Sequence, residues 1–526
     1  AVPAGRTLSF QHAEEISYLL NALIPILKEY NEGNGDPDNT KVVEYLPPKR
    51  LLEAVDFPLS TDVSKGGVSP TEIVAIVQQV LKYSVRTAHP RFFDKLYSGS
   101  DPTGQVAELI TAVTNTNCHT YAVSPVYAVM EREVVKAMAR VVGFQGAVDG
   151  LFCPGGSFSN LTAFVTARNT IFPGVKENGW LGLGVDPVCF CGSQAHYSIK
   201  RAAMICGIGT NRVVLVKTGR AGCMLAEDLD AKMRAAVEKG QTPFFVSTTA
   251  GTTVMGGFDP FQKVHQVCKK FGNVWMHVDA AWGGSLCMAE NHRHLMLGAE
   301  QADSLVWNPH KALGIPVYTS VLFVHNHPGA LQKSNSSGAE YLFHEHDASE
   351  YDLGDASLQC GRRADSLKMW LSWKRHGPRG LSSRIDKAMA NALYFRDIVL
   401  RHSSFLLVAE PMFCAVCFWY VPLFLRRSGP QGGDVDMGET GTKFTPAPGK
   451  TFDALESITN KIYAKMQSRG NILVNFNPLP DHNLPSFFRI IVNSPNVEKE
   501  DLDFVLEEIC TIGEEIEEEK KERSNS

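Results

Sequence analysis

Long apolar runs are the first thing this 526-residue sequence lacks. No apolar run reaches the roughly 18 residues that a membrane-spanning helix needs. The opening residues, Ala1-Val-Pro-Ala-Gly-Arg6, also lack the apolar core of a signal peptide. We therefore expect a cytoplasmic protein with no membrane partner.

An excess of basic charge is absent as well. The chain has 51 Lys and Arg against 56 Asp and Glu, which gives a net charge of −5 with the two signs mixed. This balance gives no reason to expect a nucleic-acid partner. The sequence is 44% hydrophobic and 20% charged, as is ordinary for a globular enzyme, and is long enough for two or three domains.

Matched cysteine pairs are missing, although the chain has twelve cysteines. Several of them, such as Cys206 and Cys268, lie in apolar runs, which is typical of reduced thiols rather than of a disulfide framework. The closest pairs, Cys189-Phe-Cys191 and Cys414-Ala-Val-Cys417, have no second pair to complete a zinc site. We expect no metal.

The beginning of the chain predicts helices. Apolar residues recur at helical spacing from Phe10 to Tyr30. Ser69 and Pro70 are suited to cap and open a further helix. We expect an N-terminal helical segment over residues 1–110, which packs on the main domain or on another subunit.

Strand-like runs and helical segments alternate between residues 187 and 325. The predicted strands cover residues 187–191, 212–217, 243–247, 274–278, 304–307 and 320–324. Such alternation is typical of a mostly parallel sheet covered on both faces, with ligands at the carboxyl ends of its strands. The sequence therefore predicts an α/β fold with a large domain over residues 111–400.

The last part of the chain predicts a smaller α+β domain over residues 401–515. Its expected strands are 415–420, 472–475 and 487–492, and its expected helices lie near 451–469 and 499–512. Two further helical stretches, 365–376 and 383–402, lead into it. We interpret 427–448 as a low-complexity loop. The end of the chain, from Glu514 to Ser526, is predicted as a charged, fraying helix and tail, with residues 516–526 as the tail.

Two strand ends carry residues that suggest chemistry. One strand ends in Asp279, and Lys311 follows the next strand in the stretch Trp307-Asn-Pro-His-Lys311. A lysine amine can form a Schiff base with pyridoxal phosphate (PLP), and a carboxylate can keep the pyridine nitrogen of PLP protonated. The turn Pro154-Gly-Gly-Ser157 precedes a predicted helix and can hold the phosphate group.

Four motifs together resemble those of the group II PLP-dependent amino-acid decarboxylases. They are Ser193-Gln-Ala-His-Tyr-Ser198, His277-Val-Asp-Ala-Ala-Trp282, Trp307-Asn-Pro-His-Lys311 and Gln359-Cys-Gly-Arg-Arg-Ala-Asp365. The similarity runs from about residue 70 to 515 and is to the acidic-amino-acid branch. That branch holds glutamate decarboxylase, cysteine sulfinate decarboxylase and a glutamate decarboxylase-like protein. The resemblance implies PLP as cofactor, the aspartate-aminotransferase type of fold (fold type I), and a homodimer with both active sites at the subunit interface.

The resemblance also implies a role for individual residues. Lys311 would form the Schiff base, Asp279 would pair with the pyridine nitrogen, and His196 would stack on the ring. Tyr341, in a mobile loop, would reach the neighbouring subunit's site and protonate Cα. Arg489 would hold a substrate carboxylate. The other expected cofactor contacts are Gly156, Ser157, Phe158, Thr252, Ala281 and His310.

The sequence departs from glutamate decarboxylase where the substrate side chain is expected. Tyr97 matches the aromatic residue of the cysteine sulfinate and aspartate enzymes, and His119 replaces a phenylalanine of the glutamate enzyme. Asn117 and Lys95 complete the expected substrate surroundings. Lys95 either adds a cation beside the distal acid group or faces solvent in a pair with Asp94.

These residues predict a small acidic substrate. Tyr97 would favour an acid one methylene shorter than glutamate, so the expected reactions convert cysteine sulfinate to hypotaurine, cysteate to taurine or aspartate to β-alanine. The alternative is a glutamate decarboxylase that makes GABA. More distant alternatives are an aromatic-amino-acid decarboxylase, which Arg489 would not suit, and an inactive scaffold relative, which the intact Lys311 argues against.

Overall fold

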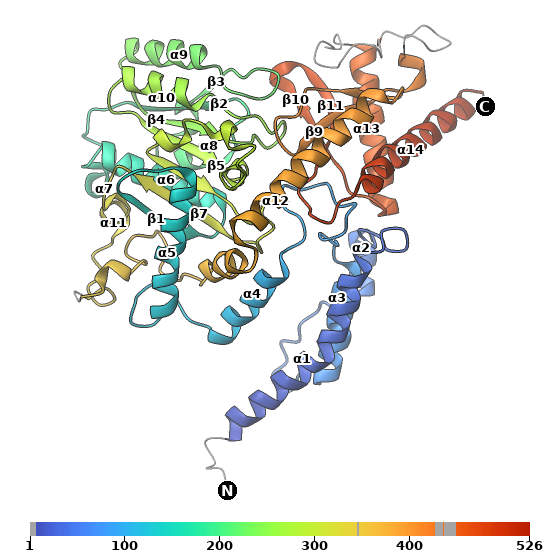
Figure 1. Cartoon of the computed structure of the whole chain (residues 1–526), viewed down its shortest axis with the longest axis horizontal. Helices are drawn as coiled ribbons and strands as arrows, with labels where there is room; N and C mark the ends of the chain where they lie inside the picture. Colours follow the sequence, from blue (N-terminus) through green and yellow to red (C-terminus); the bar gives the residue numbers. More distant parts are fainter. Residues whose placement is uncertain (1–6, 345–346, 427–434, 436–448, 526) are drawn as a thin grey trace.

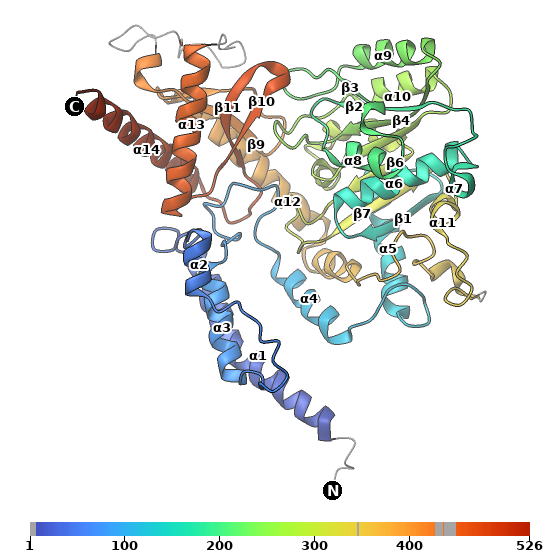
Figure 2. The ribbon, with the colours of Figure 1, turned by 180° about the vertical axis from the view of Figure 1, so that it is seen from behind.

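The structure is a computed structural model that describes residues 7–344, 347–426, 435 and 449–525. Two β-sheets lie side by side, and helices α1 to α3 extend away from both (Figures 1 and 2). Apart from Val435, the loop predicted at 427–448 lies outside the described residues. No helix in the described part of the chain is long and apolar enough to cross a membrane.

The larger sheet has seven strands in the order β1-β7-β6-β5-β4-β2-β3. Every neighbouring pair is parallel except the two pairs that β7 makes with β1 and β6. The strands are β1 (Val148–Cys153), β2 (Pro187–Gly192), β3 (Val213–Val216), β4 (Thr242–Thr249), β5 (Trp275–Ala280), β6 (Ser304–Trp307) and β7 (Ser320–His325). The predicted mostly parallel α/β sheet is therefore confirmed.

Helices cover both faces of this sheet. One face carries α6 (Gly156–Ile171), α7 (Val175–Asn178), α8 (Ser198–Ile205) and α11 (Ala330–Asn335). The other carries α5 (Pro125–Val142), α9 (Ala226–Glu238) and α10 (Phe261–Lys270). Because side chains alternate along a strand, Met276 and Val278 of β5 pack under α9 and α10, whereas His277 and Asp279 point toward α6.

The smaller sheet is antiparallel, with the order β10-β11-β9-β8. Its strands are β8 (Phe405–Leu407), β9 (Ala415–Tyr420), β10 (Asn475–Leu479) and β11 (Leu484–Ile491), and it packs against α13 (Lys450–Arg469) and α14 (Lys499–Asn525). The predicted strand at 472–475 is wrong, since β10 begins only at Asn475. The apolar residues before it are buried, but Leu473 forms an isolated bridge with Phe92 instead of joining the sheet.

Two long helices differ from the prediction. The two predicted stretches at 365–376 and 383–402 form one bent element, α12 (Ser366–Arg401), which kinks at Gly377, where φ is +64°, just before Pro378. The end of the chain, predicted as a charged, fraying helix and tail, is helical as far as Asn525, so α14 runs well beyond the helix predicted near 499–512. The Tyr420 hydroxyl at the end of β9 donates to Glu517 of α14 over 2.8 Å and ties this helix to the smaller sheet.

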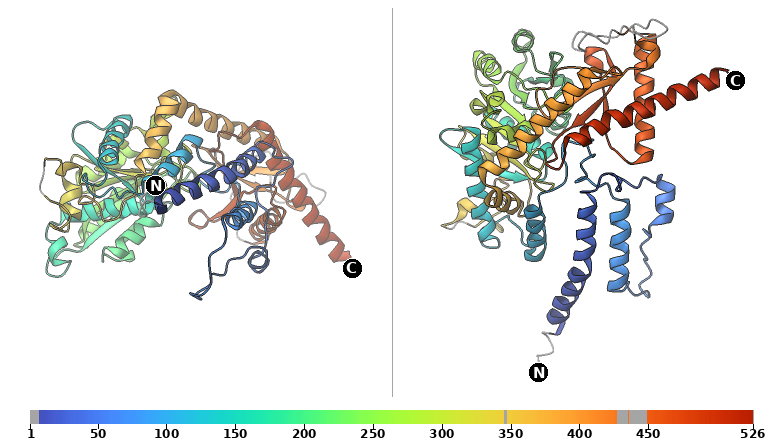
Figure 3. Two further views of the ribbon diagram at one scale, coloured as in Figure 1. Left: turned by 90° about the horizontal axis from the view of Figure 1, so that it is seen from below. Right: turned by 45° about the vertical axis from the view of Figure 1, so that its right-hand side comes forward.

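The N-terminal helices form an arm that projects from the body (Figure 3). They are α1 (Thr7–Gly33), α2 (Pro48–Ala54) and α3 (Pro70–Tyr83). Ser69 and Glu72 close a capping box at the start of α3, as the Ser69-Pro70 pair predicts. The next helix, α4 (Pro102–Thr114), returns to the body and packs on α12.

Candidate active site

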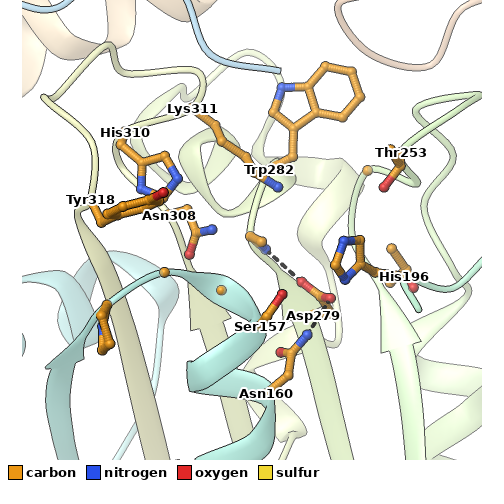
Figure 4. A pocket seen from close by; sticks show the side chains of 16 residues that line it. Ser157, Asn160, His196, Thr253, Asp279, Trp282, Asn308, His310, Lys311 and Tyr318 are labelled. Carbon is orange, nitrogen blue, oxygen red and sulfur yellow. Dashed lines mark hydrogen bonds between the residues drawn. The ribbon is translucent and has the colours of Figure 1, made fainter. Parts of the chain in front are cut away.

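A cavity of about 280 Å³ opens where β4, β5 and β6 end (Figure 4). Its walls come from the ends of these strands, the turn before α6, the loop after β2 and the loop between β6 and β7. It is lined by Pro154, Gly155, Gly156, Ser157, Asn160, His196, Thr249, Gly251, Thr253, Asp279, Ala281, Trp282, Asn308, His310, Lys311 and Tyr318. The site therefore lies at the strand ends, where the α/β pattern predicts it.

Asp279 lies at the buried end of β5. Its Oδ2 accepts a hydrogen bond from Asn160 Nδ2 over 2.8 Å, and its Oδ1 accepts one from the Ala281 amide over 3.1 Å. An ionised carboxylate has about four acceptor positions, so these two bonds leave room for a further donor. A protonated pyridine nitrogen is such a donor.

Lys311 reaches the same cavity from a turn after β6. Its backbone amide donates to the Asn308 carbonyl over 3.0 Å, which tightens this turn. Removal from water lowers the pKa of the Lys311 amine, and the nearby charge of Asp279 opposes that effect. A lowered pKa increases the share of neutral amine, the form that attacks a carbonyl carbon.

His196 lies in the loop after β2, and its ring faces the cavity beside Asp279 (Figure 4). Its Nδ1 is 2.8 Å from the Ser198 hydroxyl. Burial lowers the pKa of His196, so the ring is neutral near pH 7. A flat, neutral imidazole can stack on a cationic heterocycle without charge repulsion.

The glycine turn before α6 has little space for side chains. Gly155 has a φ of +97°, and a Cβ at Gly156 would lie 2.7 Å from Asn308 Nδ2. The backbone amides that open α6 and the Ser157 side chain lie at this end of the cavity. Free amides at a helix start bind anions, so this end suits a phosphate group.

The cavity thus offers a counterpart for each part of PLP. Lys311 suits the aldehyde, Asp279 the pyridine nitrogen, His196 the ring face and the start of α6 the phosphate. His310 completes the wall; burial lowers its pKa to about 4, so this histidine adds no positive charge. The residues present fit the cofactor that the sequence predicts.

Other predicted residues do not line this cavity. Thr253 lines it in place of Thr252, which is turned inward to accept a hydrogen bond from the Gly257 amide. Phe158 packs against the hydrophobic core between α6 and the sheet. Tyr341 lies in a turn after α11 and is 85% exposed.

The four residues expected around the substrate side chain also lie outside the cavity. Lys95 pairs with Asp94 at 2.9 Å, and Tyr97 packs near the Phe92 ring at a surface hollow that Val317 also lines. Asn117 Oδ1 accepts a hydrogen bond from the Arg362 amide, and the His119 carbonyl accepts one from the Gly354 amide.

Arg489 is a buried cation of β11 just behind the cavity wall. It is 3% exposed, and its two terminal nitrogens donate to the carbonyls of Thr253 and Asp94 over 2.6 and 3.0 Å. Its Nε has no hydrogen-bond partner in the described part of the chain. Burial lowers the pKa of Arg489, against the influence of Cys417 and Asp94.

The residues that the prediction missed include Asn160 and Asn308. Both stand inside motifs that the sequence does show: Asn160 follows the glycine turn, and Asn308 precedes Lys311 by three positions. The place of these two amides inside the motifs was the available signal. Tyr318 lies in an irregular loop and gave none.

The comparisons with known proteins agree with this geometry. The pyridoxal-dependent decarboxylase conserved domain matches residues 58–421. Acidic amino acid decarboxylase GADL1 of Mus musculus is 39% identical over 478 residues, which cover 90% of this chain and 82% of that protein. For GADL1 of Homo sapiens the identity is 37% over 481 residues, with 91% and 87% covered.

A solved structure confirms the predicted fold. The crystal structure of mouse CSAD matches with a TM-score of 0.86 at 36% identity, and the match covers 95% of this chain and 98% of that one. The chain therefore belongs to the pyridoxal-dependent decarboxylase family, as an amino-acid decarboxylase that uses PLP.

Proposed function

We propose that this enzyme removes the α-carboxylate of a small acidic amino acid. The proposed substrates are cysteine sulfinate, cysteate and aspartate, in preference to glutamate. The names of the GADL1 relatives, which are acidic amino acid decarboxylases, support the acidic class. The observation that carries the proposal is the environment of Arg489.

A buried cation is costly unless a charge or several hydrogen bonds compensate it. Among the described residues, Arg489 hydrogen-bonds two backbone carbonyls and no carboxylate, and its Nε has no partner. The charges of Asp94 and Cys417 only partly offset the burial that lowers its pKa. An acid group of the substrate, reaching past Thr253, would supply a further negative charge. An apolar aromatic side chain would not, which argues against the aromatic alternative.

Lys95 and Tyr97 contribute less than the sequence suggests. Lys95 is half-exposed and already paired with Asp94, so the geometry favours the solvent-facing alternative. Tyr97 lies across the 315–318 loop from the cavity, because its hollow is lined by Ile315, Pro316 and Val317. We propose that Tyr97 influences substrate length through this loop, which also carries Tyr318 of the cavity wall.

A bound PLP would supply an electron sink for the pair released as the bond from Cα to the carboxylate breaks. Asp279 favours the protonated pyridine nitrogen, because an opposite charge stabilises the charged form. His196 holds the ring plane. We propose that Tyr341 returns a proton to Cα; since it lies outside the cavity of its own chain, it would act after a loop movement or in the site of a second subunit.

We also propose that the enzyme is a homodimer. Helix α4 presents Val106, Leu109 and Val113 to solvent, and its side chains Gln105 and Glu108 border the hollow that holds Tyr97. Exposed apolar rows of this kind mark interaction sites. A second copy on this surface would also cover the 315–318 loop. The twelve free cysteines support a reducing compartment such as the cytoplasm.

Replacement of the two cations near Asp94 tests the proposal. A hydrogen bond to a charged group contributes about 1.5–3 kcal/mol, so Arg489→Gln should lower kcat/KM for cysteine sulfinate by roughly 10- to 150-fold. Lys95→Met is the matched control and should stay within about twofold, since the Lys95 amine is half-exposed and lies outside the cavity. The absorbance of bound PLP should be unchanged in both. Equal effects of the two substitutions would remove Arg489 from substrate binding.

A further inference from the structure

Buried polar side chains form a continuous chain beneath the cavity, on the sheet face covered by α6. Trp275 Nε1 donates to Ser304 Oγ over 2.7 Å, and Ser304 Oγ lies 2.8 Å from His277 Nδ1. His277 Nε2 lies 3.0 Å from Asn160 Oδ1, and Asn160 Nδ2 bonds Asp279. All five residues are buried, so no solvent competes for these hydrogen bonds.

Strand geometry produces this alignment. Trp275, His277 and Asp279 are alternate residues of β5 and therefore share one face. Ser304 stands opposite His277 in the parallel register of β5 and β6. Asn160 approaches from α6 above the sheet. The polar row leads directly to the carboxylate proposed to hold the cofactor nitrogen.

The chemistry of the two ends fixes the direction of every bond. An ionised carboxylate only accepts and an indole only donates. The Asn160 amide nitrogen must therefore face Asp279, so its oxygen faces His277, which must donate from Nε2. The Ser304 hydroxyl accepts from Trp275 and is free to donate to His277 Nδ1. Burial lowers the pKa of His277 to about 4, so its ring carries the single proton that this pattern requires.

A branch of the same chain reaches His196. Asn160 Nδ2 also donates to Ser198 Oγ over 2.9 Å, which leaves the Ser198 hydroxyl proton free to donate to His196 Nδ1. The Ser198 backbone N–H, which can only donate, also points at Nδ1 from 3.3 Å. Nδ1 is therefore an acceptor, and the proton of the neutral His196 ring lies on Nε2.

We propose that Asn160 is a positioning residue through which the one-way chain from Trp275 aims the Asp279 carboxylate and holds His196 as the Nε2–H tautomer. His196 then offers the cavity a hydrogen-bond donor, suited to an acid group of the substrate, and not a base. The inference rests on the roles proposed above for Asp279 and His196.

Neutron diffraction from crystals of the PLP-bound enzyme in heavy water tests the chain directly. We expect deuterium on Nε2 of both His277 and His196 and on neither Nδ1, with the two Asn160 amide deuterons directed at Asp279 and Ser198. Deuterium on Nδ1 of either ring would overturn the proposal. This outcome does not depend on which amino acid is decarboxylated, so it is separable from a failure of the proposed function.

A pair of isosteric substitutions tests the positioning role. Asn160→Asp replaces the donor to Asp279 by a second carboxyl group, whereas Asn169→Asp makes the same change in another buried residue of α6, which bonds the Ser334 carbonyl. Asn160→Asp should weaken PLP binding at least tenfold and shift the pH titration of the bound-cofactor absorbance by about one unit. Asn169→Asp should change PLP binding by less than about twofold and should shift the pH titration by less than about 0.2 unit. Equal behaviour of the two variants would contradict the role, and the neutron measurement decides if Asn160→Asp does not fold.

Discussion

Single residues of opposite charge define the site. Asp279 ends one parallel strand and Lys311 follows the next, so the fold brings them to one cavity although 32 positions separate them. In the proposed role, the Asp279 carboxylate would favour a protonated ring nitrogen. Burial lowers the pKa of the Lys311 amine and so favours its neutral form.

Removal of the amine should abolish the site's chemistry. We expect Lys311→Ala to lose the visible absorbance of bound PLP and to release carbon dioxide at less than about one thousandth of the wild-type rate, because no other lysine lines the cavity among the described residues. Spectroscopy and carbon dioxide release measure the two effects. Lys333→Ala, on the exposed surface of α11, is the control and should match wild type. A fully active Lys311→Ala enzyme would contradict the assignment.

The sequence could predict which side chains line the cavity where a motif places a residue just at or after a strand end, as for Asp279, Lys311 and His196. It was not predictable where the backbone decides which of two neighbours faces inward. Thr252 and Thr253 are chemically equal, and only the turn that binds the Gly257 amide separates them. The partners of Arg489 are carbonyls from distant segments, which no local pattern reports.

At the scale of elements, the turn that follows α11 carries the most exposed of the predicted catalytic residues. Tyr341→Phe should leave PLP absorbance unchanged, lower decarboxylation by about 10²- to 10⁴-fold and increase the share of abortive transamination, since a positioned proton donor contributes that much. Accumulation of pyridoxamine phosphate during turnover measures the side reaction. Tyr45→Phe, in the N-terminal arm, is the control. An unchanged rate without pyridoxamine phosphate would exclude Tyr341 as the donor.

His89 anchors the segment that follows α1 to the body. Its Nε2 lies 2.9 Å from the Thr40 carbonyl, and burial lowers its pKa to about 4. The unfolded chain, with a histidine pKa near 6.5, binds more protons below that pH. The stabilisation is therefore complete above about pH 6.5 and is lost as the pH falls toward 4, by up to about 1.4 kcal/mol per unit.

Urea unfolding at pH 7, 6 and 5 measures this slope. His89→Gln should flatten the pH dependence of the free energy of unfolding relative to wild type. His294→Gln, at an exposed position, should keep the wild-type slope. An equal slope in all three proteins would show that His89 titrates alike in the folded and unfolded chains.

The local sequence pattern predicted the existence of the helices and strands more accurately than the residues at which they begin and end. The alternation of strands and helices predicted the larger sheet because each strand is a short apolar run between helices. The start of β10 was misplaced, because Leu473 just before this strand bridges to Phe92 outside the sheet. The last helix runs beyond the predicted end near residue 512, to Asn525. The domain boundaries at 110, 400 and 515 stay a prediction.

For the whole molecule, the exposed apolar face of α4 is the surface through which we propose that two copies of the chain associate. We expect the enzyme to sediment at twice its chain mass of 57.8 kDa. Val113→Asp places a charge on a 69% exposed apolar site of that face and should shift the mass toward the monomer, with loss of activity. Val237→Asp, on the exposed side of α9, is the control and should remain dimeric. A monomeric wild type with full activity would contradict the proposed dimer.

We propose that a PLP site beside a buried arginine decarboxylates short acidic amino acids. The decisive measurement is carbon dioxide release from cysteine sulfinate, cysteate, aspartate, glutamate and tryptophan, compared as kcat/KM with PLP in excess. One methylene is worth about 1–3 kcal/mol in a binding pocket, so the best short acid should exceed glutamate by roughly 10- to 200-fold, with no release from tryptophan. A lead by glutamate would contradict the proposed substrate length, and release from tryptophan alone would contradict the acidic substrate class.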